Sequence, residues 1–163
     1  AVDFLDKKTL ISKVLNGKYE VIKLKELIKS YQYGLSEKSS KEDIGTPMLR
    51  MNNIFNSEIV VESLKYINID DSAKNKYLLD KGDLLFNRTN SKALVGKTAI
   101  FNKDGEYTFA SYLIRVVIDS NKANFNYVNY LFNSTLLKYQ KDKALTRSAF
   151  IFIINVIRSE SDS

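Results

Sequence analysis

The amino-acid sequence predicts a single globular α+β domain, on three observations. The chain has 163 residues and 44% hydrophobic side chains, enough for one core. Short apolar runs and scattered helical patterns follow one another without the regular strand–helix–strand order of a parallel sheet. Strong turn signals separate them, above all Asp104-Gly105, because glycine supplies the positive φ that tight turns need. We therefore expect short strands, a hairpin and a few helices.

The first half of the chain is expected to contain one helix and several strands. Apolar residues recur at helical spacing over 5–16, and Gly17 stands where a helix C-terminal cap is expected. Further elements are predicted as a strand over 21–24, a helical turn at 27–28, a polar loop over 34–47 with the only proline, and strands over 48–54 and 58–61.

The second half is expected to hold two helices around a hairpin. Asp70, Asp71 and Ser72 offer N-cap oxygens for a helix ending near Gly82. Strands are predicted over 84–86 and 98–101, and the Asp104-Gly105 turn should pair the latter with a strand over 107–118. A last helix should open at Asn124, with an apolar face of Val128, Leu131, Phe132, Leu136 and Tyr139.

The most informative segment spans residues 82–101. An apolar strand runs into a stretch of hydrogen-bonding and cationic side chains, and a Gly-Lys turn leads to a second apolar strand. Such side chains on a rigid scaffold suit phosphate oxygens and base edges. They suit covalent catalysis poorly, since that chemistry needs an activated nucleophile and a base. An ordinary hydrophilic loop is the competing interpretation.

The charge distribution favours a polyanion-binding face on the same half of the chain. The net charge is +6, and residues 81–149 carry 11 basic against 5 acidic side chains, whereas residues 1–80 carry 13 against 12. A general lysine bias would also explain the excess, because 20 of the 25 basic residues are lysine. The aromatic content, 10 tyrosines and 9 phenylalanines, more often fills a core than stacks on bases.

Several catalytic classes are disfavoured. The chain has no histidine and no cysteine, so it lacks the commonest general base and any thiolate metal site. Gly96-Lys97-Thr98 resembles the end of a P-loop, but Ser91 replaces the required glycine and a strand follows instead of a helix. An acid-x-Lys nuclease triplet occurs only as Asp6-Lys7-Lys8, and one proline in the chain argues against a base methyltransferase. Residue types alone leave two-carboxylate glycosidase chemistry open, although nothing points to it.

No apolar stretch approaches the roughly 18 residues that span a bilayer, and the first residues lack signal-peptide architecture. We expect no membrane contact and a cytoplasmic location.

Four segments, in order and at matching spacing, resemble one protein family. They are residues 49–54, 82–91, 95–101 and 109–115, within a resemblance that runs from about Tyr19 to Ser134. The chain is similar to a target recognition domain of the specificity (S) subunit of type I restriction–modification enzymes.

The resemblance implies a strongly twisted, largely antiparallel or mixed sheet with flanking helices. It implies that the domain reads one half of a bipartite double-stranded DNA site, within a subunit that carries two such domains separated by long helices. The implied partners are the modification and restriction subunits, to which S-adenosylmethionine, ATP and magnesium would belong. This chain is then a non-catalytic part of an enzyme complex, without a cofactor of its own.

The candidate DNA-binding residues come from the polar stretches of these segments. On strand alternation Arg50 and Asn52 share one face and Asn53 the other, so we expect at least one of the three to be structural. Asn87 could contact DNA or hydrogen-bond the turn, and Lys97 could contact phosphate or be solvated. Residues 34–47 and 119–123 are further candidates for sequence preference. The full candidate set is Arg50, Asn52, Asn87, Arg88, Thr89, Asn90, Ser91, Lys92 and Lys97.

The expected organisation is an N-terminal helix over 1–17, a recognition domain over 18–148, and an atypical strand and polar tail over 149–163. The resemblance implies a short polar stretch, a proline-rich strand and then a long spacer helix, whereas residues 149–157 are an apolar run followed by a polar tail. An excised domain, a degenerate or truncated gene product and a half-subunit acting as a homodimer all remain open. The alternative function is a non-DNA-binding interaction or assembly domain from a degenerate or truncated specificity subunit.

Overall fold

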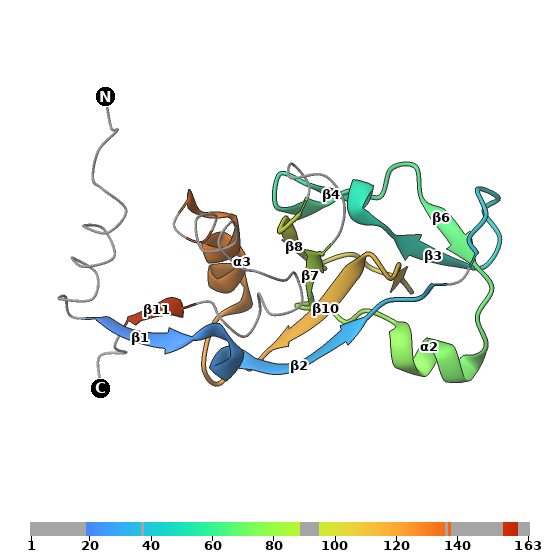
Figure 1. Ribbon diagram of the computed structural model, residues 1–163. Coiled ribbons are helices and arrows are strands. Elements are labelled where there is room, and N and C mark those ends of the chain that lie inside the picture. Colours follow the sequence, from blue (N-terminus) through green and yellow to red (C-terminus); the bar gives the residue numbers. More distant parts are fainter. Residues whose placement is uncertain (1–18, 37, 89–94, 136, 138–154, 160–163) are drawn as a thin grey trace, which may run out of the picture.

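A computed structural model describes residues 19–36, 38–88, 95–135, 137 and 155–159 (Figure 1). The strands are β1 (Tyr19–Lys23), β2 (Ile28–Tyr33), β3 (Thr46–Leu49), β4 (Ile54–Phe55), β5 (Glu58–Ile59), β6 (Lys65–Ile67), β7 (Leu84–Asn87), β8 (Thr98–Ile100), β9 (Thr108–Phe109), β10 (Leu113–Ile118) and β11 (Asn155–Ser159). The helices are α2 (Asp71–Tyr77) and α3 (Phe125–Asn133), with 3₁₀ turns η1 (Leu24–Leu27) and η2 (Met51–Asn53).

The central sheet has the strand order β2-β10-β7-β8, and every neighbouring pair is antiparallel. Helix α3 packs on one face of this sheet, where the Phe132 ring lies 5.9 Å from the Phe86 ring. Val128, Leu131 and Phe132 are buried there with apolar residues of β7 and β10. Burying this helical stripe gives α3 most of its stability, since a helix of nine residues is marginal in water.

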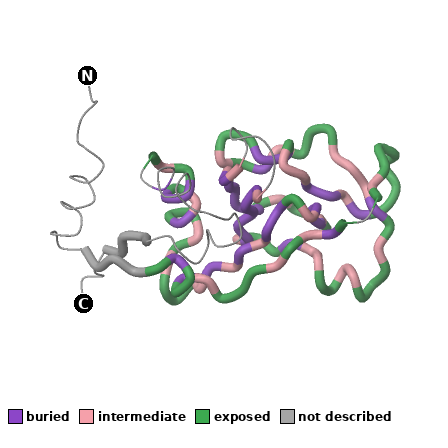
Figure 2. Tube along the Cα trace, viewed as in Figure 1, coloured by how far each residue is buried: buried purple, intermediate pink, exposed green. Residues whose placement is uncertain are grey.

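The opposite face of the central sheet packs on a second core. It includes Leu85, Leu113 and the buried rings of Phe101 and Phe109. Over it lies a three-stranded sheet of order β6-β3-β9, in which β3 and β9 run parallel and β3 and β6 antiparallel. Buried residues run through the centre of the molecule, while α2 and the outer loops consist of exposed and intermediate residues (Figure 2).

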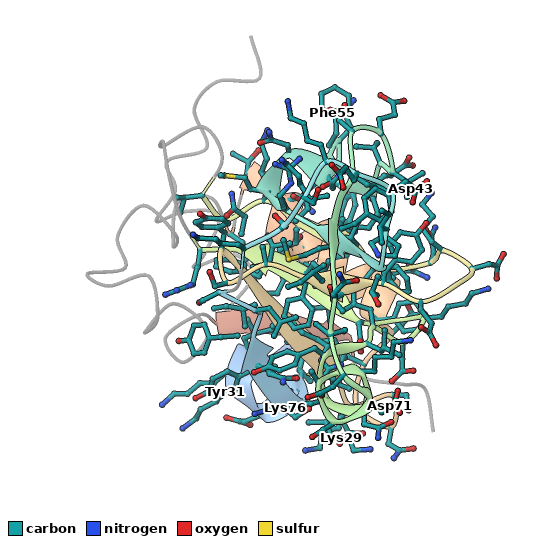
Figure 3. All side chains as sticks on the ribbon, turned by 90° about the vertical axis from the view of Figure 1, so that its right-hand side faces the viewer. Lys29, Tyr31, Asp43, Phe55, Asp71 and Lys76 are labelled. Carbon is teal, nitrogen blue, oxygen red and sulfur yellow. The ribbon has the colours of Figure 1, made fainter. Side chains whose placement is uncertain are left out.

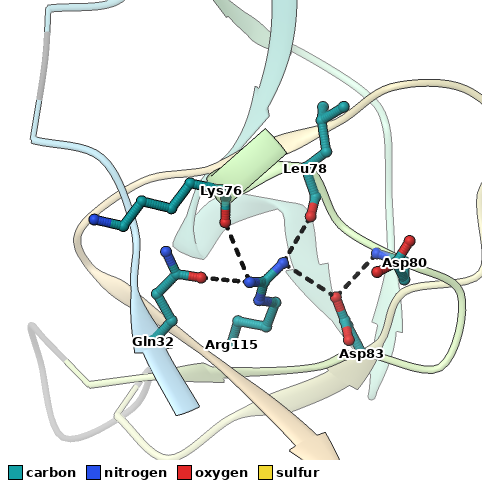
Figure 4. Close-up of polar contacts among 6 residues, drawn as sticks. All are labelled: Gln32, Lys76, Leu78, Asp80, Asp83 and Arg115. Carbon is teal, nitrogen blue, oxygen red and sulfur yellow. Dashed lines mark hydrogen bonds and ion pairs between the residues drawn. The ribbon is translucent and has the colours of Figure 1, made fainter. Parts of the chain in front are cut away.

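A half-buried arginine, Arg115, ties α2 to the central sheet (Figure 4). Arg115, on β10, donates from Nη1 to the Leu78 carbonyl at 2.7 Å and from Nη2 to the Lys76 carbonyl at 3.2 Å. Its Nη2 also donates to the Gln32 side chain on β2, and its Nη1 lies 3.7 Å from the Asp83 carboxylate. Arg115 thus satisfies carbonyls at the end of α2 that have no partner within the helix.

Several sequence predictions are confirmed. The α+β class holds, and the strands on either side of the central polar stretch pair as β7 and β8. Asp70 caps α2 by accepting from the Ala73 amide, and Asn124 caps α3 by accepting from the amides of residues 126 and 127. The helix over 5–16 and the face residues Leu136 and Tyr139 lie outside the described residues.

The predicted hairpin at Asp104-Gly105 is wrong in its pairing. Gly105 does have a positive φ of 102°, but β8 pairs with β7 and β9 pairs with β3. The backbone on both sides of the turn bonds elsewhere: the Leu79 amide donates to the Tyr107 carbonyl and the Phe101 amide to the Asp83 carbonyl. The predicted strand over 107–118 is accordingly divided into β9 and β10.

Three further expectations are wrong in detail. The strand over 48–54 ends at Leu49, because the Asn53 side chain accepts from the Arg50 amide and closes η2. Helix α2 ends at Tyr77 rather than near Gly82, since Leu79 is drawn into the core. Residues 28–33 form β2, and the expected helical turn lies just before it, as η1.

Near the end of the chain, β11 includes residues 155–157 of the predicted strand and continues to Ser159. Strand β11 pairs antiparallel with β1, with residue 157 opposite residue 21. The pair lies at the end of the molecule away from β3 and β6 (Figure 1). The first part of the predicted strand over 149–157 lies outside the described residues, and the domain boundaries stay a prediction.

Candidate nucleic-acid interface

The central polar segment is the connection of a β-hairpin between β7 and β8. The Asn87 amide donates to the Lys97 carbonyl at 2.9 Å, and the Gly96 amide donates to the Asn87 carbonyl at 2.8 Å. Gly96 has a φ of 80°, which favours glycine, and it is buried at the base of the connection. The segment from Arg88 onward is therefore carried on a fixed, hydrogen-bonded base.

Arg88 is the first residue beyond β7, and three contacts fix it. Its amide donates to the Tyr112 carbonyl at 3.1 Å, and its Nε donates to the Ser111 carbonyl at 2.9 Å. Its guanidinium lies over the Tyr33 ring, with Cζ 4.8 Å from the ring centroid. Within the described residues, Nη1 and Nη2 make no hydrogen bond, and they are the two donors that a ligand could engage.

Exposed tyrosines surround this arginine. Tyr31 is 46% exposed, Tyr33 40% and Tyr112 44%. The rings of Tyr31 and Tyr33 meet edge to face, with centroids 6.5 Å apart and planes at 83°. Figure 3 shows Tyr31 extending outward from the body of the molecule. We call Tyr31, Tyr33, Arg88 and Tyr112 the arginine–tyrosine surface.

Strand register explains why these residues share one face. Tyr33 stands opposite Ile114 and Tyr31 opposite Val116, and both partners point into the core beneath α3. Because side chains alternate along a strand, Tyr31, Tyr33, Tyr112 and Arg88 extend the same face beyond the part that α3 covers. The chain thus leaves aromatic rings and a guanidinium where that face meets solvent.

The segment 109–112 connects this surface to the other loops. The Leu35 amide donates to the Phe109 carbonyl, and the Ser111 amide donates back to the Leu35 carbonyl. The Ala110 amide donates to the Leu49 carbonyl, next to Arg50. The segment thereby joins the starts of the 34–47 loop, the 50–53 turn and the 88–95 connection at one end of the domain.

The Arg50 region is partly structural. Arg50 is half-buried, and its Nη2 donates to the Ser63 carbonyl at 2.9 Å. Asn53 is buried and donates from Nδ2 to the carbonyls of Val60 and Glu62. The expectation that one of Arg50, Asn52 and Asn53 is structural is confirmed for Asn53, whereas Asn52 is exposed.

The remaining candidates divide by their placement. Asn87 is only 1% exposed, which favours its role in the hairpin over direct contact with a ligand. Lys97 is half-buried, and its carbonyl accepts from the Asn87 amide across the hairpin. Thr89, Asn90, Ser91 and Lys92 lie outside the described residues.

The two irregular segments named as carriers of sequence preference lie at opposite ends of β10. The 34–47 loop begins beside Tyr33, at the Arg88 end. The 119–123 turn follows the far end of β10, where the Asp119 amide donates to the Leu27 carbonyl and Lys122 Nζ to the Glu26 carbonyl. Of these two segments, the 34–47 loop therefore lies next to the arginine–tyrosine surface, and the 119–123 turn lies away from it.

Sequence reasoning missed the tyrosines of this surface. Tyr31 and Tyr33 are two residues apart, a spacing that places both on one face of a strand. That signal was obscured because Leu27 and Ile28 suggested a helical turn. Tyr112 stood within a recognised motif, but its exposure depends on the turn between β9 and β10.

Nothing among the described residues gathers three or more His, Cys, Asp or Glu side chains into a metal-binding cluster. Across the same residues, no helix has the length and apolar character needed to cross a membrane.

Comparison with known proteins gives a consistent result. Residues 16–151 match the family model described as the type I restriction modification DNA specificity domain. The chain is 31% identical over 149 residues to a putative type I restriction enzyme MjaX specificity subunit of Methanocaldococcus jannaschii, covering 88% of this chain and 35% of that protein. It is 25% identical over 118 residues to the type I restriction enzyme StySPI specificity subunit of Salmonella potsdam, covering 71% of this chain and 26% of that protein.

Solved structures share the fold. The HsdS subunit of Thermoanaerobacter tengcongensis superposes with a TM-score of 0.61 at 14% identity, covering 93% of this chain and 39% of that chain. A chain from a study of complex assembly and conformational transition of the type I R-M system gives 0.62, also at 14% identity, and covers 93% and 40%. The chain therefore spans about a third of its MjaX relative and about two fifths of these solved chains.

Proposed function

The chain belongs to the type I restriction modification DNA specificity domain family, and from this membership we propose that it reads a short sequence in double-stranded DNA. Because it covers about a third of the MjaX relative, we further propose that it supplies one of two recognition domains and reads one half of a bipartite site.

The observation that carries this proposal is the placement of Arg88. Its guanidinium is held at Nε by a backbone carbonyl and lies over an aromatic ring, at the base of the cationic β7–β8 connection. A planar fork whose Nη donors make no hydrogen bond within the described residues matches the paired acceptors of a phosphate group or of guanine O6 and N7. The positive excess of residues 81–149 supplies the long-range attraction that a polyanion requires.

The proposed partners are the modification and restriction subunits of the same type I system. Methylation and cleavage then belong to those subunits, together with S-adenosylmethionine, ATP and magnesium, and this chain supplies sequence preference. In that case, the purified chain should neither methylate nor cut duplex DNA when S-adenosylmethionine and magnesium are added. Cleavage or methylation abolished by changing one carboxylate of this chain would show a catalytic role.

Salt dependence of duplex binding tests the DNA interface. The 163-residue chain should bind a mixed-sequence duplex, and the logarithm of affinity should fall linearly with the logarithm of salt concentration, by about 0.9 per phosphate contact. Fluorescence anisotropy of a labelled duplex measures this slope. A slope near zero, or no binding at low salt, would favour the assembly-domain alternative.

A further inference from the structure

We propose that Tyr33 is a positioning residue of the DNA interface, which holds the Arg88 guanidinium in one orientation so that its Nη edge reads a pair of acceptors. This inference rests on the proposed function and deepens it. It assigns the orientation of the arginine to the edge strand β2, about 55 residues earlier in the chain than Arg88.

Two contacts at different positions of the guanidinium define its orientation. The Ser111 carbonyl accepts from Nε at 2.9 Å, which fixes one edge. The guanidinium lies over the Tyr33 ring, with Cζ 4.8 Å from the ring centroid. A hydrogen bond at Nε and a ring contact at Cζ together restrict rotation of the group, so the remaining edge, with Nη1 and Nη2, points in a set direction.

Tyr33 is itself supported. The Tyr31 ring meets it edge to face at 6.5 Å, and the Tyr33 backbone pairs with Ile114 in the buried part of β10. Immediately after it, Gly34 is packed against the carbonyls of Phe109 and Ala110. Tyr33 is 40% exposed, so it is not a core residue. An exposed aromatic ring is what the support of a surface cation needs.

Pre-organisation gives this arrangement its effect on binding. An arginine side chain loses rotational freedom when it docks on a ligand, and a guanidinium that is already fixed loses less. Removing the ring should therefore weaken binding even though Tyr33 need not touch DNA. Stacking is an aromatic property, so phenylalanine should substitute for Tyr33 and leucine should not.

The acceptors could be two phosphate oxygens or O6 and N7 of guanine, since both present the same geometry to the fork. The two sources give different results in one measurement. Loss of a phosphate contact shallows the salt slope by about 0.9 and weakens all duplexes alike. Loss of a base contact reduces the preference for one duplex over others and leaves the slope nearly unchanged.

The test is a double-mutant cycle on the 163-residue chain, with Tyr33→Leu, Arg88→Ala and their combination. The probes are a duplex enriched by the wild-type chain from a randomised library and a mixed-sequence duplex. We expect each single change to weaken binding to the enriched duplex about 5- to 100-fold, and the double variant to be no weaker than Arg88→Ala alone. Tyr33→Phe should bind within about twofold of the wild type. The control is Tyr130→Leu, at a tyrosine of α3 that is 73% exposed, and it should also bind within about twofold of the wild type.

The outcomes separate this proposal from the proposed function. If the wild-type chain enriches a duplex while Tyr33→Leu binds like the wild type, or if the losses of the two variants simply multiply, the positioning role is wrong and DNA recognition stands. If no duplex is bound, the proposed function itself fails. Melting temperatures identify any variant that is partly unfolded, and the Tyr33→Phe variant, which keeps the ring, then decides: weak binding by a folded Tyr33→Phe chain overturns the proposal.

Discussion

Arg115 illustrates at the residue scale how this chain uses arginine for two purposes. Arg88 makes no Nη hydrogen bond within the described residues, whereas Arg115 has its Nη donors engaged by carbonyls at the end of α2, by Gln32 and by Asp83. The Asp83 carboxylate is almost fully buried, and burial raises its pKa above the ordinary 3.8, although the Asp80 amide and the Arg115 guanidinium oppose the rise. The carboxylate is thus tolerated because of these two partners.

Replacing Arg115 should destabilise the fold with a pH dependence of known sign. Arg115→Ala leaves two carbonyls and a buried carboxylate without their partner, and we expect a loss of about 2–4 kcal/mol at pH 7. The pKa of Asp83 is higher in the folded chain than the value of 3.8 of a free side chain. Its protonation therefore stabilises the fold below pH 3.8, and this stabilisation is lost as the pH rises through the folded-state pKa. Since the variant raises the Asp83 pKa further, its deficit should be smaller at pH 4 than at pH 7.

Urea unfolding at both pH values measures this difference. The matched control is Arg115→Ala in an Asp83→Asn background, where the deficit should lose most of its pH dependence. An equal deficit at both pH values in the original background would show that Asp83 and Arg115 are not coupled.

At the scale of elements, the interface depends on how closely β2 approaches the segment 109–112. A Cβ placed on Gly34 would lie 2.3 Å from the Phe109 carbonyl oxygen and 2.4 Å from that of Ala110. Both are backbone atoms, and the Leu35 amide donates to the Phe109 carbonyl while the Gly34 amide donates to that of Leu113, the first residue of β10. Glycine is thus required here for space.

Gly34→Ala should therefore separate β2 from this segment. We expect a loss of stability of more than about 2 kcal/mol, because backbone cannot move aside as a side chain can. The comparison is Gly105→Ala, where φ is 102° and the new Cβ would meet only the Tyr107 ring at 3.7 Å. That change should cost only backbone strain, about 1–2 kcal/mol. Thermal unfolding ranks the two, and an equal or smaller effect at Gly34 would refute the close-approach account.

The sequence predicts those elements whose interactions are local in the chain and not those whose partners are distant in it. Local signals predicted the Asp70 and Asn124 caps, the apolar face of α3 and the β7–β8 pair. The parallel pairing of β3 with β9 and the division at residues 110–112 depend on partners distant in the chain, which no local pattern contains. Arg88 was identified from its neighbours, but Tyr33 could be assigned to it only through the register of β2 on β10.

At the scale of the whole molecule, the fold gathers three loop starts at one end of the central sheet. The loops after Tyr33, Leu49 and Asn87 all attach to residues 109–112 or lie beside them, and the 119–123 turn lies at the other end of β10. This arrangement predicts that the loops after Tyr33, Leu49 and Asn87 determine which DNA sequence is preferred. Exchanging residues 119–123 should leave the preferred duplex unchanged, whereas exchanging the 34–47 loop should alter it, as selection from a randomised duplex library would measure.

Selection by the wild-type chain from that library is the most direct test of sequence-specific DNA recognition. We expect enrichment of one short contiguous sequence, with each mismatched base pair costing about 1–3 kcal/mol in binding. Arg88→Ala should reduce or relax that enrichment, and Lys65→Ala on β6 should not. If the folded chain binds every duplex equally, or binds none, it does not recognise a DNA sequence.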